Sequence, residues 1–167
     1  GDNLLREKLG LPLRRAALAQ PWTEKEPEDT CPIELIYTIA CEDEIKGASL
    51  GLESIEAAEI WLDGNTVSVE KGEEFYVDPC IKVIRLPDLT EGSHELRIRY
   101  AFHRKVNLEA CYILGEFDVR VSGSRTVLFR KEDRNVRNFW GSLTEQGMPF
   151  YGGNADYRTQ VDLEAGE

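Results

Sequence analysis

The stretch PDLTEGSHELRIRYAF, residues 87–102, decides the fold of this chain. It opens with a turn rich in Pro, Asp and Gly and continues as a strict alternation of side chains. One face of the alternation carries Leu96, Ile98, Tyr100 and Phe102, and the other face carries charged side chains. This pattern is typical of an antiparallel β-strand with one buried face. One strand cannot bury its apolar face alone, so the rest of the chain must supply partner strands.

Short runs with the same period follow one another along most of the chain. Residues 33–41 are almost all apolar and β-branched, which predicts a central strand. Asp63 and Gly64 form a turn dipeptide between two runs, which predicts a hairpin in which Trp61 points outward. We expect further strands over residues 47–52, 57–63, 65–69, 75–77, 81–86, 109–114, 117–121, 125–130 and 155–163.

Strands this short, with a turn about every 8–12 residues, indicate an all-β sandwich or barrel. We prefer a sandwich with jelly-roll connections, because long irregular crossovers interrupt the hairpins. Residues 3–20 form the one helical stretch, broken at Gly10 and Pro12. Either a short broken helix that packs on another element or a partly ordered arm fits it. The prediction is a helical arm and charged linker over residues 1–30 and a jelly-roll β-sandwich over residues 31–167.

The charge of the chain argues against several classes of partner. It has 31 acidic and 20 basic residues, which give a formal net charge of −11. Nucleic acids and anionic lipids both need a positive face, so we expect neither nucleic acid nor membrane as a partner. The four cysteines, Cys31, Cys41, Cys80 and Cys111, include no CxxC pair and there are only two histidines. No zinc spacing results, and we predict buried free thiols rather than disulfides.

The sequence leaves the cellular compartment open. It begins with Gly rather than Met and shows no basic segment followed by an apolar run, as a signal peptide would. We therefore expect a piece of a longer multidomain protein, with the cytoplasm slightly favoured.

Three segments together resemble a known group of domains. They are AEIWLDGNTV (58–67), YVDPCIKVIRLPDLTEGSHELRIRY (76–100) and LTEQGMPFYGGNADYRTQVDL (143–163). In this order they resemble galactose-binding-like jelly-roll domains, the accessory β-sandwiches beside the catalytic barrels of bacterial β-galactosidase, β-glucuronidase and α-rhamnosidase-type enzymes. Residues 103–117 and the GMPFYGGN run also resemble uncharacterised glycosyl hydrolases of gut-type bacteria. The resemblance covers roughly residues 33–163 and implies an accessory domain whose partner is the catalytic domain of the same parent chain.

Aromatic and amide side chains gather near residues 139–154 and form the best candidate binding site. Sugar rings stack on aromatic faces while amides bond their hydroxyls, and ligand pockets in general combine an apolar floor with a few polar groups. We predict that carbohydrate contacts Trp140, Phe150, Tyr151, Asn154 and, separately, Trp61. In the alternative interpretation, these aromatic side chains plug the edge of the sandwich or dock on a neighbouring domain.

No catalytic set stands out among the acidic residues. A glycosidase needs two carboxylates roughly 5–10 Å apart. Glu109 is the one acid in an apolar stretch, and a structural carboxylate bonded to Arg104 or to backbone is the simpler interpretation. Asp78 and Asp88 are conceivable calcium ligands, but their loops lack a regular acidic spacing. We therefore predict no catalytic residue, no metal and no cofactor.

The predicted function is a non-catalytic accessory domain that either binds carbohydrate or supports the catalytic domain of a glycoside hydrolase. Two alternatives remain open at this point. The chain could be a small glycosidase that uses carboxylates such as Glu109 and Asp156. It could instead be an interaction domain without a ligand, docking on a partner through the helical stretch at residues 3–20.

Overall fold

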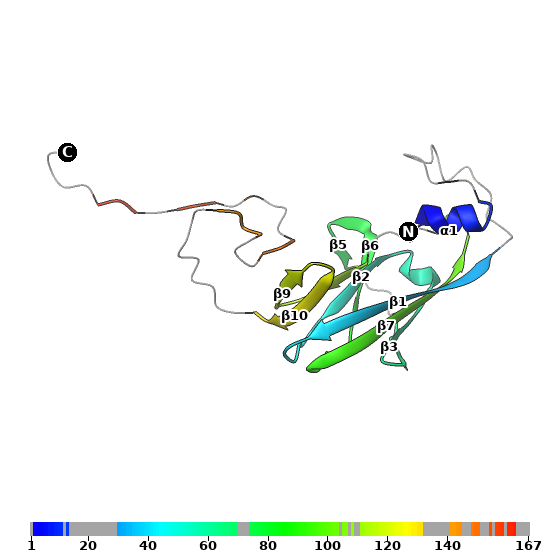
Figure 1. Ribbon diagram of the computed structural model, residues 1–167, viewed down its shortest axis with the longest axis horizontal. Helices are drawn as coiled ribbons and strands as arrows, with labels where there is room; N and C mark the ends of the chain where they lie inside the picture. Colours follow the sequence, from blue (N-terminus) through cyan, green and yellow to red (C-terminus); the bar gives the residue numbers. More distant parts are fainter. Residues whose placement is uncertain are drawn as a thin grey trace.

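The computed structural model describes residues 2–11, 13, 30–69, 74–103, 105, 106, 108, 111–131, 141–144, 148–150, 154, 156–158 and 160–162. Within these ranges lie a short helix, α1 (Asp2–Lys8), a 3-10 turn (Ile55–Ala57) and ten strands (Figure 1). The strands are β1 (Cys31–Cys41), β2 (Ser49–Glu53), β3 (Ala58–Leu62), β4 (Asn65–Thr66), β5 (Phe75–Tyr76), β6 (Asp78–Arg85), β7 (Gly92–Phe102), β8 (Tyr112–Leu114), β9 (Phe117–Ser122) and β10 (Arg125–Arg130). The mostly β architecture confirms the predicted all-β class.

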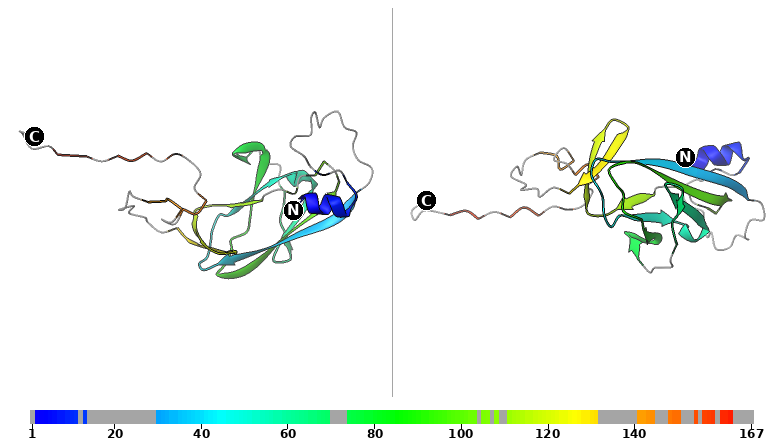
Figure 2. Two further views of the ribbon diagram at one scale, coloured as in Figure 1. Left: turned by 45° about the horizontal axis from the view of Figure 1, so that its top comes forward. Right: turned by 90° about the horizontal axis from the view of Figure 1, so that it is seen from below.

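The described strands form two sheets that share one core. The larger sheet has six strands in the order β4-β3-β7-β1-β10-β9, and the smaller has four in the order β5-β6-β2-β8. Ile39 and Leu96 of the larger sheet belong to the same buried apolar cluster as Leu50 and Ile84 of the smaller one. The chain passes from one sheet to the other after β1, β2, β4, β6, β7 and β8. Two sheets around one core make a β-sandwich, which Figure 2 shows from two further sides.

Strand β7 lies inside the larger sheet, between β1 and β3. It pairs antiparallel with β1 along all 11 of its residues, from Gly92 opposite Cys41 to Phe102 opposite Cys31. The four apolar side chains of its predicted inner face are at most 1 % exposed: Leu96, Ile98, Tyr100 and Phe102. Burying each of them contributes on the order of 1.5–3 kcal/mol. The alternation therefore predicted both the strand and its buried face.

Helix α1 packs on the sandwich at one end of β7. Its Arg6 is only 3 % exposed and forms an ion pair with Asp2 at 2.8 Å. The Arg6 guanidinium lies 5.6 Å from the centroid of the Phe102 ring and donates to the Val106 carbonyl at 3.4 Å. The predicted helix therefore forms and docks on this chain's own core. The part of the predicted helical stretch that follows Pro12 falls almost entirely outside the described residues.

The structure differs from the prediction at residues 155–163. The described members of this segment, 156–158 and 160–162, are not in a strand. Figure 1 shows the segment leading away from the sandwich. An alternation of apolar and polar side chains is compatible with a strand, but a strand also needs a neighbouring strand that accepts and donates its backbone hydrogen bonds. The sequence pattern alone does not predict whether another strand lies beside the segment.

His94 lies on the buried face of β7, and both of its ring nitrogens face oxygen acceptors. Nδ1 lies 2.6 Å from Asp63 Oδ2, and Nε2 lies 2.8 Å from the Thr90 carbonyl oxygen. Since neither oxygen donates, this geometry favours the doubly protonated ring. Burial disfavours that charge, but the Asp63 carboxylate and the Thr90 carbonyl outweigh burial and raise the pKa of His94. The hydrogen bond from His94 in turn lowers the pKa of Asp63.

We predict that this pair makes stability depend on pH. The raised pKa of His94 gives a contribution present below about pH 6.5 and lost as pH rises through the folded-state pKa. The lowered pKa of Asp63 gives a contribution present above about pH 3.9 and lost as pH falls. Because the Asp63 side chain is 43 % exposed, Asp63→Asn should lower the unfolding free energy by only about 1–2 kcal/mol at pH 6, and by less at pH 9. Urea denaturation at the two pH values measures both.

Glu91→Gln is the matched control for this experiment. It removes one negative charge from an exposed side chain in the turn before β7. Its effect should stay within about 0.5 kcal/mol at both pH values. An equal penalty for Asp63→Asn at pH 6 and pH 9 would contradict a charged pair.

Candidate functional site

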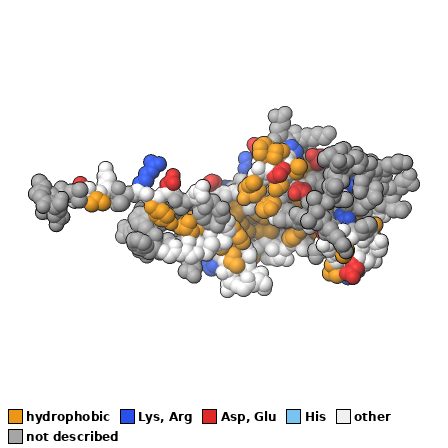
Figure 3. Space-filling view, turned by 90° about the horizontal axis from the view of Figure 1, so that it is seen from above, with side chains coloured by type: hydrophobic (Ala, Val, Ile, Leu, Met, Phe, Trp, Pro, Cys, Tyr) orange, Lys and Arg blue, Asp and Glu red, His pale blue; other side chains and the backbone are white. Residues whose placement is uncertain are grey.

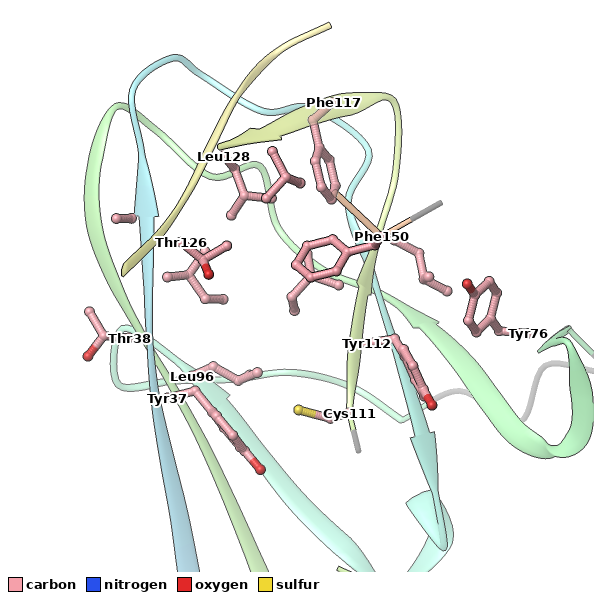
Figure 4. Close-up of a pocket in the computed structure, with 15 residues that line it drawn as sticks. Tyr37, Thr38, Tyr76, Leu96, Cys111, Tyr112, Phe117, Thr126, Leu128 and Phe150 are labelled. Carbon is pink, nitrogen blue, oxygen red and sulfur yellow. The ribbon is translucent and has the colours of Figure 1, made fainter. Parts of the chain in front are cut away.

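A pocket opens between the two sheets where the larger sheet extends past the smaller one. Among the described strands, the larger sheet continues through β10 to β9, whereas the smaller sheet ends at β8. The pocket has a volume of about 730 Å³ and is shown in Figure 4. Its lining residues are Tyr37, Thr38, Ile39, Ala40, Tyr76, Leu96, Cys111, Tyr112, Ile113, Leu114, Phe117, Val119, Thr126, Leu128 and Phe150. We call it the tyrosine pocket, after the three tyrosines in this set.

The floor of the tyrosine pocket is a continuation of the core. Ile39, Leu96 and Leu128 are each at most 6 % exposed and belong to the buried apolar cluster. Phe117 and Val119 of β9 are half-buried and pack against the same cluster. These side chains alternate along β1, β7, β9 and β10 as inward-facing residues do. The sequence therefore builds the floor by the same rule that builds the core.

Burial makes two polar side chains of the pocket, Tyr37 and Cys111, harder to ionise. Burial, and then the neighbouring Cys111 thiol, raise the pKa of Tyr37 to about 12. Burial also raises the pKa of Cys111, whose side chain forms a hydrogen bond with Tyr37. No Asp or Glu side chain occurs among the described lining residues. The pocket thus offers hydroxyls, a thiol and apolar surface, which suit an uncharged ligand.

Beside the pocket lies a strip of exposed apolar side chains, which we call the apolar ledge: Phe75, Tyr76, Val77 and Tyr112. The rings of Tyr76 and Tyr112 lie 5.2 Å apart between centroids, at 53° to one another. Val77 is 82 % exposed and has a φ of +61°, a strained conformation for a β-branched residue that costs about 1–3 kcal/mol. Figure 3 shows a group of hydrophobic side chains on the face seen from above.

The structure brings one of the predicted carbohydrate contacts to the pocket. The ring of Phe150 points into it (Figure 4), although this residue is 72 % exposed overall. Asn154 is exposed and does not line the pocket. Trp140 and Tyr151 fall outside the described residues, so their predicted roles stay predictions.

Trp61 lies away from the pocket, on the outer face of the larger sheet. It points outward as predicted, because its neighbours Ile60 and Leu62 are buried. The Arg99 guanidinium covers its ring at 5.1 Å from the centroid, and Arg99 also pairs with Glu34 at 2.6 Å. Trp61 therefore belongs to a charged surface ladder and not to the tyrosine pocket.

The acidic residues weighed from the sequence that the structure describes, Asp78, Asp88 and Asp156, do not assemble into a site. Asp78 accepts a hydrogen bond from the Cys80 amide at 2.8 Å, and Asp88 accepts one from the Gly47 amide at 3.1 Å. Asp156 is exposed, and Glu109 falls outside the described residues. Over the part of the chain that the structure describes, no three His, Cys, Asp or Glu residues gather as metal ligands would. No helix in that same part could cross a membrane.

Sequence reasoning missed most of the pocket. Tyr37, Tyr76, Tyr112 and Cys111 were assigned to strands or their flanks but not to a site. A tyrosine in an alternating strand has the same pattern whether the opposite sheet covers it or leaves it open. One available signal was the occurrence of polar-tipped aromatics in several apolar runs, since a buried hydroxyl needs a partner. What the sequence did not reveal was that the two sheets differ in width.

A scan against protein-family models, a search of curated proteins and a search of solved structures each find no match to this chain. The fold and the pocket by themselves define the class. It is an all-β protein of two packed sheets with an uncharged, aromatic-lined pocket at the open side of the sandwich.

The thiols provide a test of the core and of the pocket. All four cysteines are free, as predicted, but only Cys41 is buried; Cys31 and Cys111 are half-buried and Cys80 is exposed. We predict that N-ethylmaleimide modifies Cys80 much faster than Cys41, with Cys111 between them, because access dominates even though Asp78 raises the pKa of Cys80. Peptide mass mapping of the native protein over time measures the order. Modification of Cys41 as fast as Cys80 would contradict its place in the core.

Proposed function

We propose that this chain is a non-catalytic accessory module of a larger glycoside hydrolase and that its tyrosine pocket binds carbohydrate. The lining of the pocket carries the proposal. It combines an apolar floor with the hydroxyls of Tyr37, Tyr76 and Tyr112 and has no carboxylate among its described residues. A neutral sugar can place its C–H faces on such rings and exchange hydrogen bonds with such hydroxyls. The three sequence segments that resemble galactose-binding-like domains occur in the same order as in those domains, which supports an accessory module of a glycoside hydrolase.

Binding fits this pocket better than catalysis does. Hydrolysis of a glycosidic bond requires two carboxylates that flank it, and the described lining offers neither. A pKa of about 12 keeps Tyr37 protonated at neutral pH, so it is not a ready nucleophile. The conclusion is a module that holds a ligand while another domain performs the reaction.

The strand order supports the jelly-roll type in part. The chain passes repeatedly between the two sheets, as jelly-roll connections require. The β3–β4 hairpin and the consecutive strands β6 and β7, which lie in different sheets, coincide with two of the segments that carry the family resemblance. The parallel pairing of β1 with β10 is the feature that departs from a wholly antiparallel jelly roll.

We predict that neutral oligosaccharides bind to this pocket and are not hydrolysed. Tyr112→Ala and Tyr76→Ala should each weaken binding about tenfold, or about 1.4 kcal/mol, because each removes a ring at the mouth. Isothermal titration calorimetry with a panel of galactose- and rhamnose-containing oligosaccharides measures the affinities. Chromogenic glycosides measure turnover.

Trp61→Ala is the control, since Trp61 lies on the outer face of the larger sheet, away from the pocket. It should leave the affinity unchanged. An absence of binding across the panel at millimolar concentration would refute carbohydrate as the ligand, and turnover by this chain alone would refute the non-catalytic assignment.

A second candidate role is to dock on the catalytic domain of the same parent chain. The apolar ledge favours it, because Phe75 and Val77 are 54 % and 82 % exposed at one place on the surface. The strained backbone of Val77 is a further indication, since strain that lowers stability is found preferentially at functional sites. A neighbouring domain that covers the ledge would bury these side chains.

We predict that Val77→Gly stabilises the isolated chain by about 1 kcal/mol, because glycine adopts a positive φ without strain. Urea denaturation measures the change. The control is Val121→Gly, at an exposed valine within regular strand β9. That substitution should destabilise the chain, since glycine weakens strands. A loss of stability in Val77→Gly would show that Val77 contributes packing and is not held under strain.

A further inference from the structure

The tyrosine pocket is apolar at its inner end and polar at its mouth. The side chains of its floor belong to the buried apolar cluster or pack against it: Ile39, Leu96, Phe117, Val119 and Leu128. At the mouth, Tyr76 and Tyr112 are 37 % and 36 % exposed, so a ligand group beside them stays in contact with water. A ligand that fills the pocket therefore meets apolar side chains at its inner end, and hydroxyls and water at its outer end.

The floor favours a methyl group over a hydroxyl. A hydroxyl that leaves water without a new hydrogen-bond partner loses free energy, whereas a methyl group gains free energy when it leaves water. The Tyr37 hydroxyl and the Cys111 thiol are already engaged in a hydrogen bond with one another. The threonine hydroxyls of the described lining belong to exposed residues, Thr38 and Thr126. A ligand hydroxyl therefore finds its partners near the mouth and not on the floor.

Two side chains of the floor form a single apolar patch. Val119 of β9 and Leu128 of β10 lie directly opposite one another in the antiparallel pairing of these strands. Side chains at such paired positions contact each other on one face of the sheet. Both line the pocket, and Figure 4 shows the ring of Phe150 pointing into the same space. The patch is a surface on which one small apolar substituent of a sugar can rest.

We propose that the tyrosine pocket selects 6-deoxy sugars, in which a methyl group replaces the terminal hydroxymethyl group of a hexose. The methyl group rests on the patch formed by Val119 and Leu128. A C–H face of the sugar ring packs on Phe150, and the ring hydroxyls lie toward Tyr76 and Tyr112 at the mouth. This inference rests on the proposed carbohydrate-binding function and names the class of sugar that the pocket takes.

The test compares sugars that differ only in the methyl group. Methyl α-L-fucoside is paired with methyl α-L-galactoside, and methyl α-L-rhamnoside with methyl α-L-mannoside. Isothermal titration calorimetry with the full chain measures the affinities. In each pair that binds, we expect the 6-deoxy sugar to bind about tenfold more tightly than its partner. Saturation-transfer difference NMR should show the strongest transfer to the protons of the C5 methyl group.

Val119→Thr places a hydroxyl on the floor at nearly constant side-chain volume. It should reduce the preference for the 6-deoxy sugar from about tenfold to about threefold or less, because the floor then offers a hydrogen-bond partner. Val121→Thr is the matched control, since Val121 lies on the same face of β9 but is 43 % exposed and is not among the described lining residues. It should keep the full preference. Far-UV circular dichroism checks that both variants fold.

Three results would overturn this inference and leave carbohydrate binding in place. They are equal or weaker binding of the 6-deoxy sugars, an unchanged preference in Val119→Thr, and binding of the oligosaccharide panel without binding of any of the four methyl glycosides. An absence of binding by the four glycosides and by the whole panel would refute the proposed function as well, so the two failures are distinguishable.

Discussion

The antiparallel register between β1 and β7 is the constraint on which the rest of the structure depends. A slip of one residue would turn Glu95, Arg97 and Arg99 into the core and Leu96 and Ile98 into water. The two strands pair along their whole length, so this register also positions β3 on one side and β10 on the other. The width of the larger sheet, and with it the open side that holds the pocket, follows from that central pair.

The two buried polar side chains in the described part of the chain lie at opposite ends of β7. Arg6 reaches the C-terminal end over Phe102, and His94 occupies the N-terminal end beside Asp63. Each is paired with a carboxylate, since an unpaired charge at such a place would be costly. The apolar side chains of β7 between them are therefore flanked at both ends by directional polar contacts. Such contacts specify the strand register more strictly than apolar packing alone.

The sequence predicted the faces of β7, the central position of β1 and the Asp63–Gly64 hairpin, because alternation and turn dipeptides report local geometry. The alternation places His94 on the same face as Leu96, but its contact with Asp63 was not predicted, because Asp63 is distant in sequence. The sequence placed Phe150 in the candidate site but missed Tyr37 and Tyr112, because their role depends on where the opposite sheet ends. The predicted strand over residues 155–163 illustrates the same limit of sequence analysis. Alternation predicts which side chains share a face but not which strand would pair with the segment.

The two ends of the sandwich differ in the length of the strands that build them. Around β7 the strands are long and continuous, whereas β5 has two residues and β8 has three. Short strands make few backbone hydrogen bonds, so this region opens at a lower free energy than the central pair. The exposed ledge, with the strained Val77, and the Tyr76 and Tyr112 side of the pocket lie in this less stable part, whereas the floor of the pocket belongs to the long central strands.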